Sequence, residues 1–439
     1  MSAPARPSLV VVGNGMAGMR TVEELLALAP DLYDITVFGA EPRVNYNRIM
    51  LSPVLAGEKT PEDIVLHPRA WYERHGITLH AGDPVVAIDR RRRIVRARSG
   101  RQVRYDRLLL ATGSQPVMLP VPGATLPGVV GFRDLDDVEA MLRAARAGGH
   151  AVVIGGGLLG LEAASGLRRR GMDVTVVHLA GSLLNQQLDA DAALLLKDEL
   201  ERRGLRIVLG ARTEAILGND KVQGVRLAGG AAIPADLVVM AAGVRPEVAL
   251  ARAAGLHVER AIVVDDTLQS YDPRVYAVGE CVQHRKATFG LVAPIWEQAR
   301  VCAAHLAGLG HRRYVQQASD ARLKVTGIAL YSAGDISGGA GTQELVLRDR
   351  GAGVYKRLVL DGGRITGAVL YGDVADGPWY FDLIGRGADV AALRDRLLFG
   401  SALCESQPQS QSQSQSQSQS HSDSDSDSDS QPQCQAQAA

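Results

Sequence analysis

Short apolar runs alternate with longer segments of helical periodicity along most of the chain. The apolar run LVVV at 9–12 is followed by the amphipathic segment TVEELLALA and then by DITVF. Further along, AVVIG leads into LEAASGLRRRG and then into DVTVVH. Buried strands that alternate with helices form parallel sheets with helical crossovers. We therefore predict an α/β protein in which one strand–helix–strand design occurs twice.

A second internal similarity supports the duplication. YDRLLLATGSQP at 105–116 resembles PADLVVMAAGVRP at 234–246, since each has an Asp, an apolar run, Ala-x-Gly and then a Pro. Each segment is typical of a buried strand that ends in a tight turn where only Gly leaves room for a ligand. We expect two Rossmann-like dinucleotide-binding domains, one inserted in the other, with boundaries at 1–117 plus 244–320 and at 118–243.

Glycine-rich loops follow the first strand of each unit. GNGMAG at 13–18 and GGGLLG at 155–160 both have the spacing G-x-G-x-x-G. The first glycine permits the turn, the second lets a pyrophosphate approach the backbone, and the third lets helix and strand lie close together. The helix that follows directs unpaired N–H groups and a positive dipole end at the phosphates. Two such loops, each set between strand and helix, indicate two dinucleotide sites.

Neither unit has an acidic residue at the position where such sites usually carry the carboxylate that binds the ribose. A carboxylate normally lies about 20 residues after the glycines, at the end of the second strand. After DITVF the nearest acid is Glu41, and after DVTVV comes His178 with no acid beside it. His178 could hydrogen-bond a ribose hydroxyl or, when protonated, favour a 2′-phosphate. Because no Arg follows through Gln187, we favour NADH over NADPH.

A third candidate anchor lies near residue 280. The buried strand that begins at Tyr276 ends at Gly279 and Glu280, and a carboxylate there could accept a hydroxyl from a ribityl chain. Pro294 is typical of the first residue of a helix. The positive end of that helix would stabilise the negative charge that a reduced flavin gathers. The alternative is a core strand and helix with a surface Glu.

Composition excludes several classes of function. Lys+Arg and Asp+Glu are equal at 48 each, which argues against a protein that coats nucleic acid or binds an anionic membrane. No stretch approaches the roughly 18 apolar residues of a membrane span, and the N-terminal segment lacks the long apolar run that is typical of a signal peptide. The four cysteines form no C-x-x-C, so we expect no metal site and a cytoplasmic protein. The Ser/Gln/Asp repeat predicts a disordered tail over 401–439.

Together these segments resemble the pyridine nucleotide–disulfide oxidoreductase superfamily, whose fold is that of glutathione reductase. NYNRIMLS (45–52), GGGLLGLEAA, QQLD, VGEC, FGLVAP and LKVTGIALYSAGD (323–335) resemble the flavin-bearing N-terminal part of NAD(P)H nitrite reductase large subunits. They also resemble the electron-transfer subunits of assimilatory nitrate reductase. Residues 353–400, with GPWYFDLIGRG, resemble the small C-terminal domain of that group, which we expect as an α+β domain over 321–400.

The resemblance implies that FAD binds at the first loop and NAD(P)H at the second. It places Arg48 near the isoalloxazine and Glu162 near the nicotinamide as the catalytic candidates. Arg48 could instead pair with an acid, and Glu162 could be a structural acid near a helix start. The FAD candidates are Gly13, Gly15, Met16, Ala17, Gly18, Glu41, Arg48, Val86, Thr112, Gly113, Gly279, Glu280 and Pro294. The NAD(P)H candidates are Gly155, Gly157, Leu158, Leu159, Gly160, Glu162, His178 and Gly243.

The sequence also departs from the family. Disulfide reductases and NADH oxidases carry cysteine in the segment that is RVNYNRIMLSPVLAG here, which has none. The resemblance therefore predicts that FAD passes electrons directly to a separate iron–sulfur or sirohaem protein of nitrite or nitrate assimilation. The alternatives are a rubredoxin or ferredoxin reductase of another pathway, and an interaction protein like the apoptosis-inducing factors. A homodimer is left open.

Overall fold

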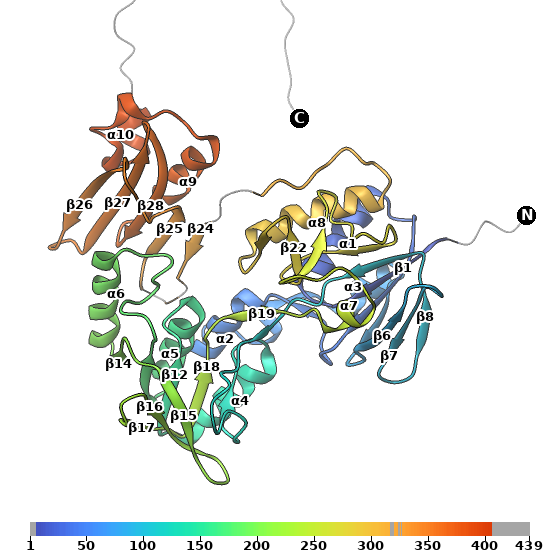
Figure 1. Ribbon diagram of the computed structural model, residues 1–439, viewed down its shortest axis with the longest axis horizontal. Coiled ribbons are helices and arrows are strands. Elements are labelled where there is room, and N and C mark those ends of the chain that lie inside the picture. Colours follow the sequence, from blue (N-terminus) through green and yellow to red (C-terminus); the bar gives the residue numbers. More distant parts are fainter. Residues whose placement is uncertain (1–5, 317–319, 324, 326, 406–439) are drawn as a thin grey trace, which may run out of the picture.

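The computed structural model describes residues 6–316, 320–323, 325 and 327–405 of the chain. It contains two parallel five-stranded sheets and a five-stranded antiparallel sheet (Figure 1). This is the predicted fold class: two Rossmann-like domains and a smaller C-terminal domain. Among the described residues, no helix combines the length and apolar character that crossing a membrane requires.

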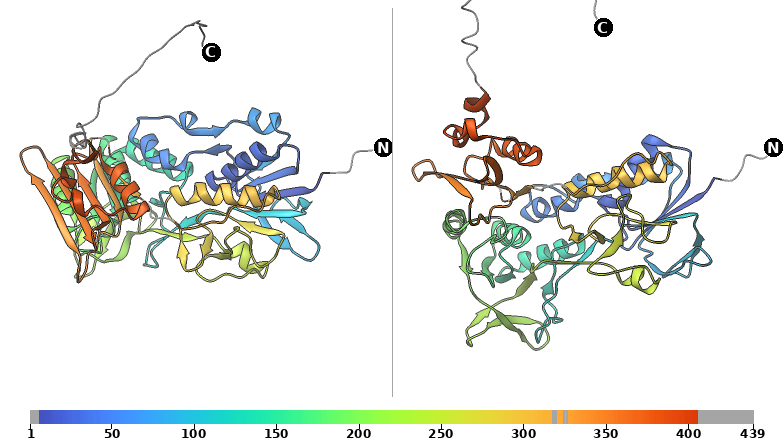
Figure 2. Two further views of the ribbon diagram at one scale, coloured as in Figure 1. Left: turned by 90° about the horizontal axis from the view of Figure 1, so that it is seen from above. Right: turned by 45° about the horizontal axis from the view of Figure 1, so that its top comes forward.

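The first parallel sheet has the strand order β21-β9-β1-β2-β5. Its centre is apolar on both faces, as a parallel sheet covered by helices requires, and Leu9, Val10 and Val11 of β1 are fully buried. Helices α1 and α8 lie side by side against it (Figure 2). The strands are β1 Ser8–Val12, β2 Asp34–Gly39, β5 Thr78–Ala81, β9 Arg107–Leu110 and β21 Val275–Ala277, and the helices are α1 Met16–Leu28, α3 Arg69–Arg74, α7 Ala249–Ala253 and α8 Ala293–Leu306.

The second parallel sheet repeats this plan in the order β11-β18-β12-β13-β14. In both sheets the central strand, β1 or β12, ends in a glycine loop that leads into a helix, α1 or α5. The strands are β11 Val129–Val130, β12 His150–Ile154, β13 Asp173–Val177, β14 Leu205–Val208 and β18 Leu237–Met240, and the helices are α4 Leu135–Ala147, α5 Leu158–Arg169 and α6 Ala190–Arg202.

A three-stranded antiparallel meander follows the edge strand of each parallel sheet, β5 or β14, which extends the duplication. The chain crosses between the two sheets along β10 and β19, which pair with each other. The meanders are β6 Val85–Asp89, β7 Ile94–Ala97, β8 Gln102–Arg104 and β15 Thr213–Gly218, β16 Val222–Leu227, β17 Ala232–Pro234. The crossings are β10 Ser114–Pro116 and β19 Val244–Pro246.

Shorter elements fill the loops around the first sheet. Helix α2 is notable because it leaves that sheet and lies against α5 of the second. These elements are β3 Asn45–Tyr46, η1 Arg48–Met50, α2 Leu51–Ala56, η2 Glu62–Ile64, β4 Val65–His67, β20 Ile262–Val264, β22 Val282–His284 and β23 Ala287–Thr288.

The antiparallel sheet near the C-terminus lies beside α6 (Figures 1 and 2). The hydroxyl of Tyr355 donates to Asp189 Oδ1 over 2.9 Å, and Arg348 pairs with Asp191. Its elements are β24 Asp320–Arg322, β25 Leu330–Gly334, β26 Gln343–Asp349, β27 Val354–Asp361, β28 Arg364–Tyr371, α9 Gly377–Arg386, η3 Ala391–Leu393, η4 Leu397–Phe399 and α10 Ser401–Glu405.

The last helix modifies the prediction for the tail. Residues 401–405 were expected to be disordered, but they form α10, in which Cys404 is buried. The backbone N–H of Ser401 donates to Asp376 Oδ1 over 3.0 Å, which fixes the start of α10 against α9. The rest of the predicted tail, 406–439, lies outside the described residues.

Candidate functional site

A cavity of about 1610 Å³ is lined by residues that follow strands of both parallel sheets. It exceeds the roughly 300–1,000 Å³ of an ordinary small-molecule site, so it has room for more than one elongated ligand. The structure brings most of the predicted site residues to this cavity. They are Gly13, Gly15, Met16, Ala17, Glu41, Arg48, Thr112, Gly113, Gly155, Gly157, Leu158, Leu159, Glu162, His178, Gly243 and Glu280.

The first glycine loop has the geometry of a phosphate cradle. Gly13 has φ +117°, and a Cβ there would overlap the carbonyl oxygen of Ala111. A Cβ on Gly18 would lie 2.7 Å from the carbonyl oxygen of Gly13. Gly15 is the N-cap of α1, has no side-chain acceptor for the helix N–H groups, and has no atom within 4 Å of an ideal Cβ. The helix N-terminus therefore opens on the cavity with unpaired donors.

The second loop reproduces this geometry. Gly155 has φ +129°, and a Cβ there would overlap the carbonyl oxygen of Ala241. Gly157 is the N-cap of α5, again without a side-chain acceptor and with no atom within 4 Å of its Cβ position. By contrast, α4 and α6 are capped by Asp134 and Asp189. The N-termini of α1 and α5, which both meet the cavity, are thus left free to bind anionic groups.

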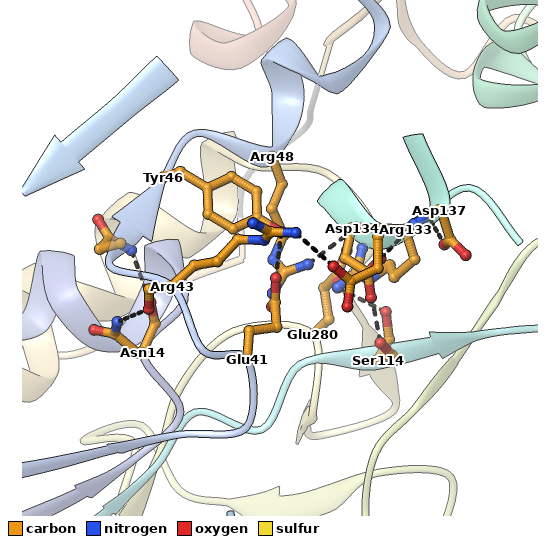
Figure 3. Close-up of polar contacts among 12 residues, drawn as sticks. Asn14, Glu41, Arg43, Tyr46, Arg48, Ser114, Arg133, Asp134, Asp137 and Glu280 are labelled. Carbon is orange, nitrogen blue, oxygen red and sulfur yellow. Dashed lines mark hydrogen bonds and ion pairs between the residues drawn. The ribbon is translucent and has the colours of Figure 1, made fainter. Parts of the chain in front are cut away.

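A polar cluster surrounds the FAD candidates Glu41 and Arg48 (Figure 3). The carboxylate of Glu41 accepts a hydrogen bond from the Tyr46 hydroxyl over 2.6 Å and pairs with the Arg48 guanidinium. Burial lowers the pKa of Arg48, but Tyr46 and Glu41 outweigh burial and leave that pKa raised. Arg48 therefore remains cationic at the cavity. Arg48 pairs with an acid and also lines the cavity. The arrangement is therefore compatible with a place beside the isoalloxazine and with a role as the ion-pair partner of Glu41.

The carboxylate of Glu280 belongs to a second cluster (Figure 3). The Ser114 hydroxyl donates to Glu280 Oε2 over 2.7 Å, and Arg133 forms an ion pair with the same oxygen. Arg133 Nε also donates to the Ser114 carbonyl over 3.1 Å, and its own carbonyl accepts from Arg48 Nη1 over 3.0 Å. This network joins segments of both sheets at the cavity wall.

The sequence did not single out Arg133. It lies in GFRDLDD, directly before the N-cap of α4, and Asp137 Oδ2 accepts its backbone N–H over 2.7 Å. An Arg followed by an acidic helix start is a weak signal, because such residues usually pair locally. Only the three-dimensional contact with Glu280 identifies Arg133 as a site residue.

Glu162 is held by a residue from a distant segment. It is the fifth residue of α5, beyond the first turn, and only 6% exposed. The helix dipole therefore does not explain it as an ordinary first-turn acid. The hydroxyl of Ser52, on α2, donates to the carboxylate of Glu162. This contact places the carboxylate at the cavity, where α2 meets α5.

His178 occupies the end of β13, where a ribose carboxylate is usual. Its Nδ1 accepts the backbone N–H of Gly156 over 3.1 Å. The ring therefore serves as an acceptor toward the glycine loop and closes that side of the cavity.

The remaining candidates do not line the cavity. Gly18 and Gly160 instead allow each helix to approach its own loop. Gly279 has φ +91° and lies against Ala17. Pro294 is the second rather than the first residue of α8, whose neighbouring residues do line the cavity. Val86 lies on β6 with 47% exposure.

Two of the cysteines are buried in the core. Cys281 and Cys302 are fully buried, and burial raises the pKa of both thiols. No group of three or more His, Cys, Asp or Glu residues is placed to hold a metal ion among the described residues.

Comparison with known proteins agrees with this geometry. The model of the family "Pyridine nucleotide-disulphide oxidoreductase" matches residues 7–338. The chain belongs to this family. Its members bind FAD and NAD(P)H, and the two cradles and the cavity fit those dinucleotides. Residues 321–388 also match the rubredoxin NAD+ reductase C-terminal domain.

The curated relatives are longer than this chain. It is 47% identical over 386 residues to the nitrite reductase [NAD(P)H] of Bacillus subtilis (strain 168), covering 88% of this chain and 48% of that protein. It is 42% identical over 403 residues to the assimilatory nitrate reductase electron transfer subunit of the same organism, covering 91% and 52%. The chain thus spans about half the length of these relatives.

Among solved structures, the covalent putidaredoxin reductase–putidaredoxin complex resembles the chain with a TM-score of 0.80 and 27% identity. The likeness covers 92% of this chain and 100% of the other. The predicted superfamily and the predicted fold are therefore both confirmed.

Proposed function

We propose that this protein is an FAD-dependent NAD(P)H oxidoreductase that passes electrons to a separate redox protein, with an iron–sulfur or sirohaem centre, of nitrite or nitrate assimilation. One observation carries the proposal: two uncapped glycine-loop helices, α1 and α5, open on the same cavity. A ligand in each cradle would extend into a shared space, as hydride transfer between two rings requires.

In this proposal the first loop holds FAD and the second holds NAD(P)H. The N–H groups after Gly15 and Gly157 bind the two pyrophosphates. The Glu41 carboxylate orients a ribose hydroxyl, and the Glu280 carboxylate orients a ribityl hydroxyl. Each of these contacts would replace one of the hydrogen bonds or ion pairs that the carboxylate makes with protein side chains. The proposed FAD residues also include Gly13, Met16, Ala17, Gly18, Val86, Thr112, Gly113, Gly279 and Pro294, and the proposed NAD(P)H residues also include Gly155, Leu158, Leu159, Gly160, His178 and Gly243.

The protein's own contribution to the reaction is positional and electrostatic. Bound FAD would supply the capacity to take a hydride from the nicotinamide and release electrons one at a time. Arg48 keeps a positive charge at the cavity, which favours an anionic reduced ring. Glu162, fixed by Ser52, orients the nicotinamide end of the coenzyme. Apolar side chains also line the cavity and would limit the entry of water.

The chemistry of the described residues supports an acceptor other than a thiol of this segment. The buried thiols of Cys281 and Cys302 have raised pKa values, and thiolate is the reactive form. They are therefore poorly suited to relay electrons. The names of the two Bacillus subtilis relatives favour nitrite or nitrate assimilation as the pathway.

A second candidate is a rubredoxin or ferredoxin reductase of another pathway. The match of residues 321–388 to the rubredoxin NAD+ reductase C-terminal domain favours it, as does the likeness to putidaredoxin reductase in complex with its partner. Both candidates share the cavity and the dinucleotides, and they differ only in the acceptor.

Rapid mixing of the reduced protein with purified acceptors distinguishes the two. The FAD-loaded protein is reduced anaerobically with NADH and mixed with a sirohaem nitrite reductase module, a rubredoxin or a ferredoxin. Fast reoxidation by the sirohaem or iron–sulfur module of nitrite or nitrate reduction supports the main proposal. Fast reoxidation by rubredoxin or ferredoxin alone replaces it with the second candidate. Failure of NADH to reduce the flavin contradicts both.

A further inference from the structure

Strand β26 forms one edge of the C-terminal antiparallel sheet, and β24 forms the other. Figure 1 shows β26 at the outer side of the molecule, with the other strands of the sheet between it and β24. Within the described part of the chain, β26 pairs only with β27. Alternate residues of an antiparallel strand direct their backbone groups to opposite sides. Every second residue of β26 therefore directs its N–H and C=O outward, where no described strand receives them.

This edge lacks several features by which proteins usually protect an exposed strand. Edge strands are commonly short, bulged, or interrupted by Pro or Lys. With seven residues, β26 is the longest edge strand among the described residues, and its pairing with β27 has no register shift. Its sequence, QELVLRD, contains no Pro, Gly or Lys. A long and regular edge of this kind can template the addition of another strand.

The sequence of β26 is complementary to itself when two copies run antiparallel about a two-fold axis at Val346. The opposed pairs are then Gln343–Asp349, Glu344–Arg348, Leu345–Leu347 and Val346–Val346. Because opposed residues must share a face of the sheet, the register can change only by moving the axis a whole residue. Moving the axis to either neighbouring leucine sets Val346 opposite Glu344 or Arg348. Only the axis at Val346 matches apolar with apolar residues and opposite with opposite charges.

The charged face of β26 can accept such a partner. Toward α6, Glu344 accepts a hydrogen bond from Arg357 Nε over 3.0 Å, and Arg348 pairs with Asp191. The side chains of Glu344 and Arg348 nevertheless remain 48% and 53% exposed, so each can take a second partner. The hydrogen bond from Arg357 lowers the pKa of Glu344, which keeps this carboxylate ionised. Pairing would therefore join ion pairs of the two copies into one row of alternating charge.

The opposite face of β26 supplies an apolar contact. Leu345 packs against the C-terminal core, and Leu347 shares its face because side chains alternate along a strand. Helix η4 lies against β26, and its residue Phe399 is 58% exposed. Leu345 of one copy would meet Leu347 of the other, close to this element. Apolar cross-strand contacts would thus add to the backbone hydrogen bonds.

We propose that two copies of this chain pair antiparallel through β26, about a two-fold axis at Val346, and so form one continuous sheet. The inference goes beyond the proposed function, since no residue of β26 lines the cavity. The residues of the C-terminal sheet that do line it belong to β24, at the opposite edge, so both cavities stay open. Because seven residues from each chain make a small interface, the dimer should form in a concentration-dependent manner.

Analytical ultracentrifugation of the FAD-loaded full chain over about 1–100 μM tests the pairing. The parent protein should shift from monomer to dimer as the concentration rises. Val346→Lys sets two ammonium groups against each other at the axis and should weaken association about tenfold or more. The control is Leu66→Lys, because Leu66 is a strand residue of similar exposure on β4, and it should leave association unchanged. NADH should reduce the flavin of all three proteins equally.

Cross-linking provides a second measurement that introduces no charge. Val346→Cys should form an intermolecular disulfide under mild oxidation, because opposed residues of antiparallel strands have Cβ atoms about 4.5–5.5 Å apart. Leu66→Cys should not cross-link beyond the background of the parent protein.

Three results would overturn the inference: a parent protein that stays monomeric, a dimer that Val346→Lys leaves intact, and a Val346→Cys protein that cross-links no more than Leu66→Cys. If the parent is monomeric and Val346→Lys slows reoxidation by the acceptor, the edge binds the acceptor protein instead of a second copy. Failure of NADH to reduce the flavin contradicts the proposed function alone, since the pairing is measured by mass and by cross-linking.

Discussion

Gly157 is the position at which a substitution should remove the coenzyme without disturbing the fold. Its φ of −85° and ψ of −179° suit any L residue, and an ideal Cβ has no atom within 4 Å. We consider Gly157→Glu. At the N-cap of α5 the new carboxylate meets the positive end of the helix, which should stabilise the fold by about 0.3–1 kcal/mol or leave it unchanged.

The same carboxylate should strongly oppose binding of a pyrophosphate. At about 4 Å and an effective dielectric constant of about 20, two unit charges repel by roughly 4 kcal/mol. Since about 1.4 kcal/mol is a factor of ten, NADH affinity should fall about a thousandfold. FAD should remain bound, because its proposed cradle is the other loop.

The assay combines thermal unfolding, flavin content and anaerobic titration with NADH. Gly385→Glu serves as control, since it adds the same charge at an exposed, open position of α9 and should leave NADH binding unchanged. A Gly157→Glu protein that keeps its NADH affinity refutes the reasoning. Loss of FAD with retention of NADH would show that the two cradles are assigned in the wrong order.

Three further substitutions test the packing and charge of the site region. Gly160→Ala should lower the free energy of unfolding by about 1–3 kcal/mol or more, since its Cβ would overlap the loop backbone, and unchanged chemical denaturation would contradict this close approach. Ser52→Ala should cost about 1–3 kcal/mol because it removes a donor from a buried carboxylate. Ser165→Ala, the control on α5, removes a buried hydroxyl that has no hydrogen-bond partner among the described residues and should cost nothing, so equal losses would refute the role of the Ser52 hydrogen bond. A hydrogen bond with His67 on β4 is the main cause of the lowered pKa of Glu23. Glu23 should therefore contribute stability that is present above pH 4.5 and lost as the pH falls below it through the folded-state pKa. Glu23→Gln should flatten this part of the plot of stability against pH, and an unchanged slope would contradict the assignment.

The glycine loops and the duplicated plan could be predicted because their determinants are local. Gly13 and Gly155 adopt positive φ values that only glycine adopts readily, and each follows an apolar run that forms a central strand. The segment at 105–116 and its counterpart at 234–246 become β9 with β10 and β18 with β19. Turn chemistry and periodicity act over a few residues, so the sequence displays them directly.

Contacts between distant segments could not be predicted in this way. Ser52 and Glu162 are separated by 110 residues, and Arg133 reaches Glu280 across 147. Neither pair has a spacing that periodicity could reveal, because both depend on how the two sheets are placed.

Helix α10 shows a different limit of the sequence. The Ser/Gln repeat indicates a polar tail, but composition does not define its first residue. Trp379 Nε1–H donates to Glu405 Oε1 over 2.9 Å, and Cys404 is buried against the C-terminal core. These contacts extend order to residue 405, beyond the predicted end at 400.

Anaerobic titration of the yellow protein with NADH tests the central claim most directly, namely that one chain holds a flavin and a nicotinamide in reacting contact. One equivalent of NADH should abolish the visible absorbance of one bound FAD, with one NAD+ formed. A protein that binds both dinucleotides but retains its full flavin absorbance would contradict the account.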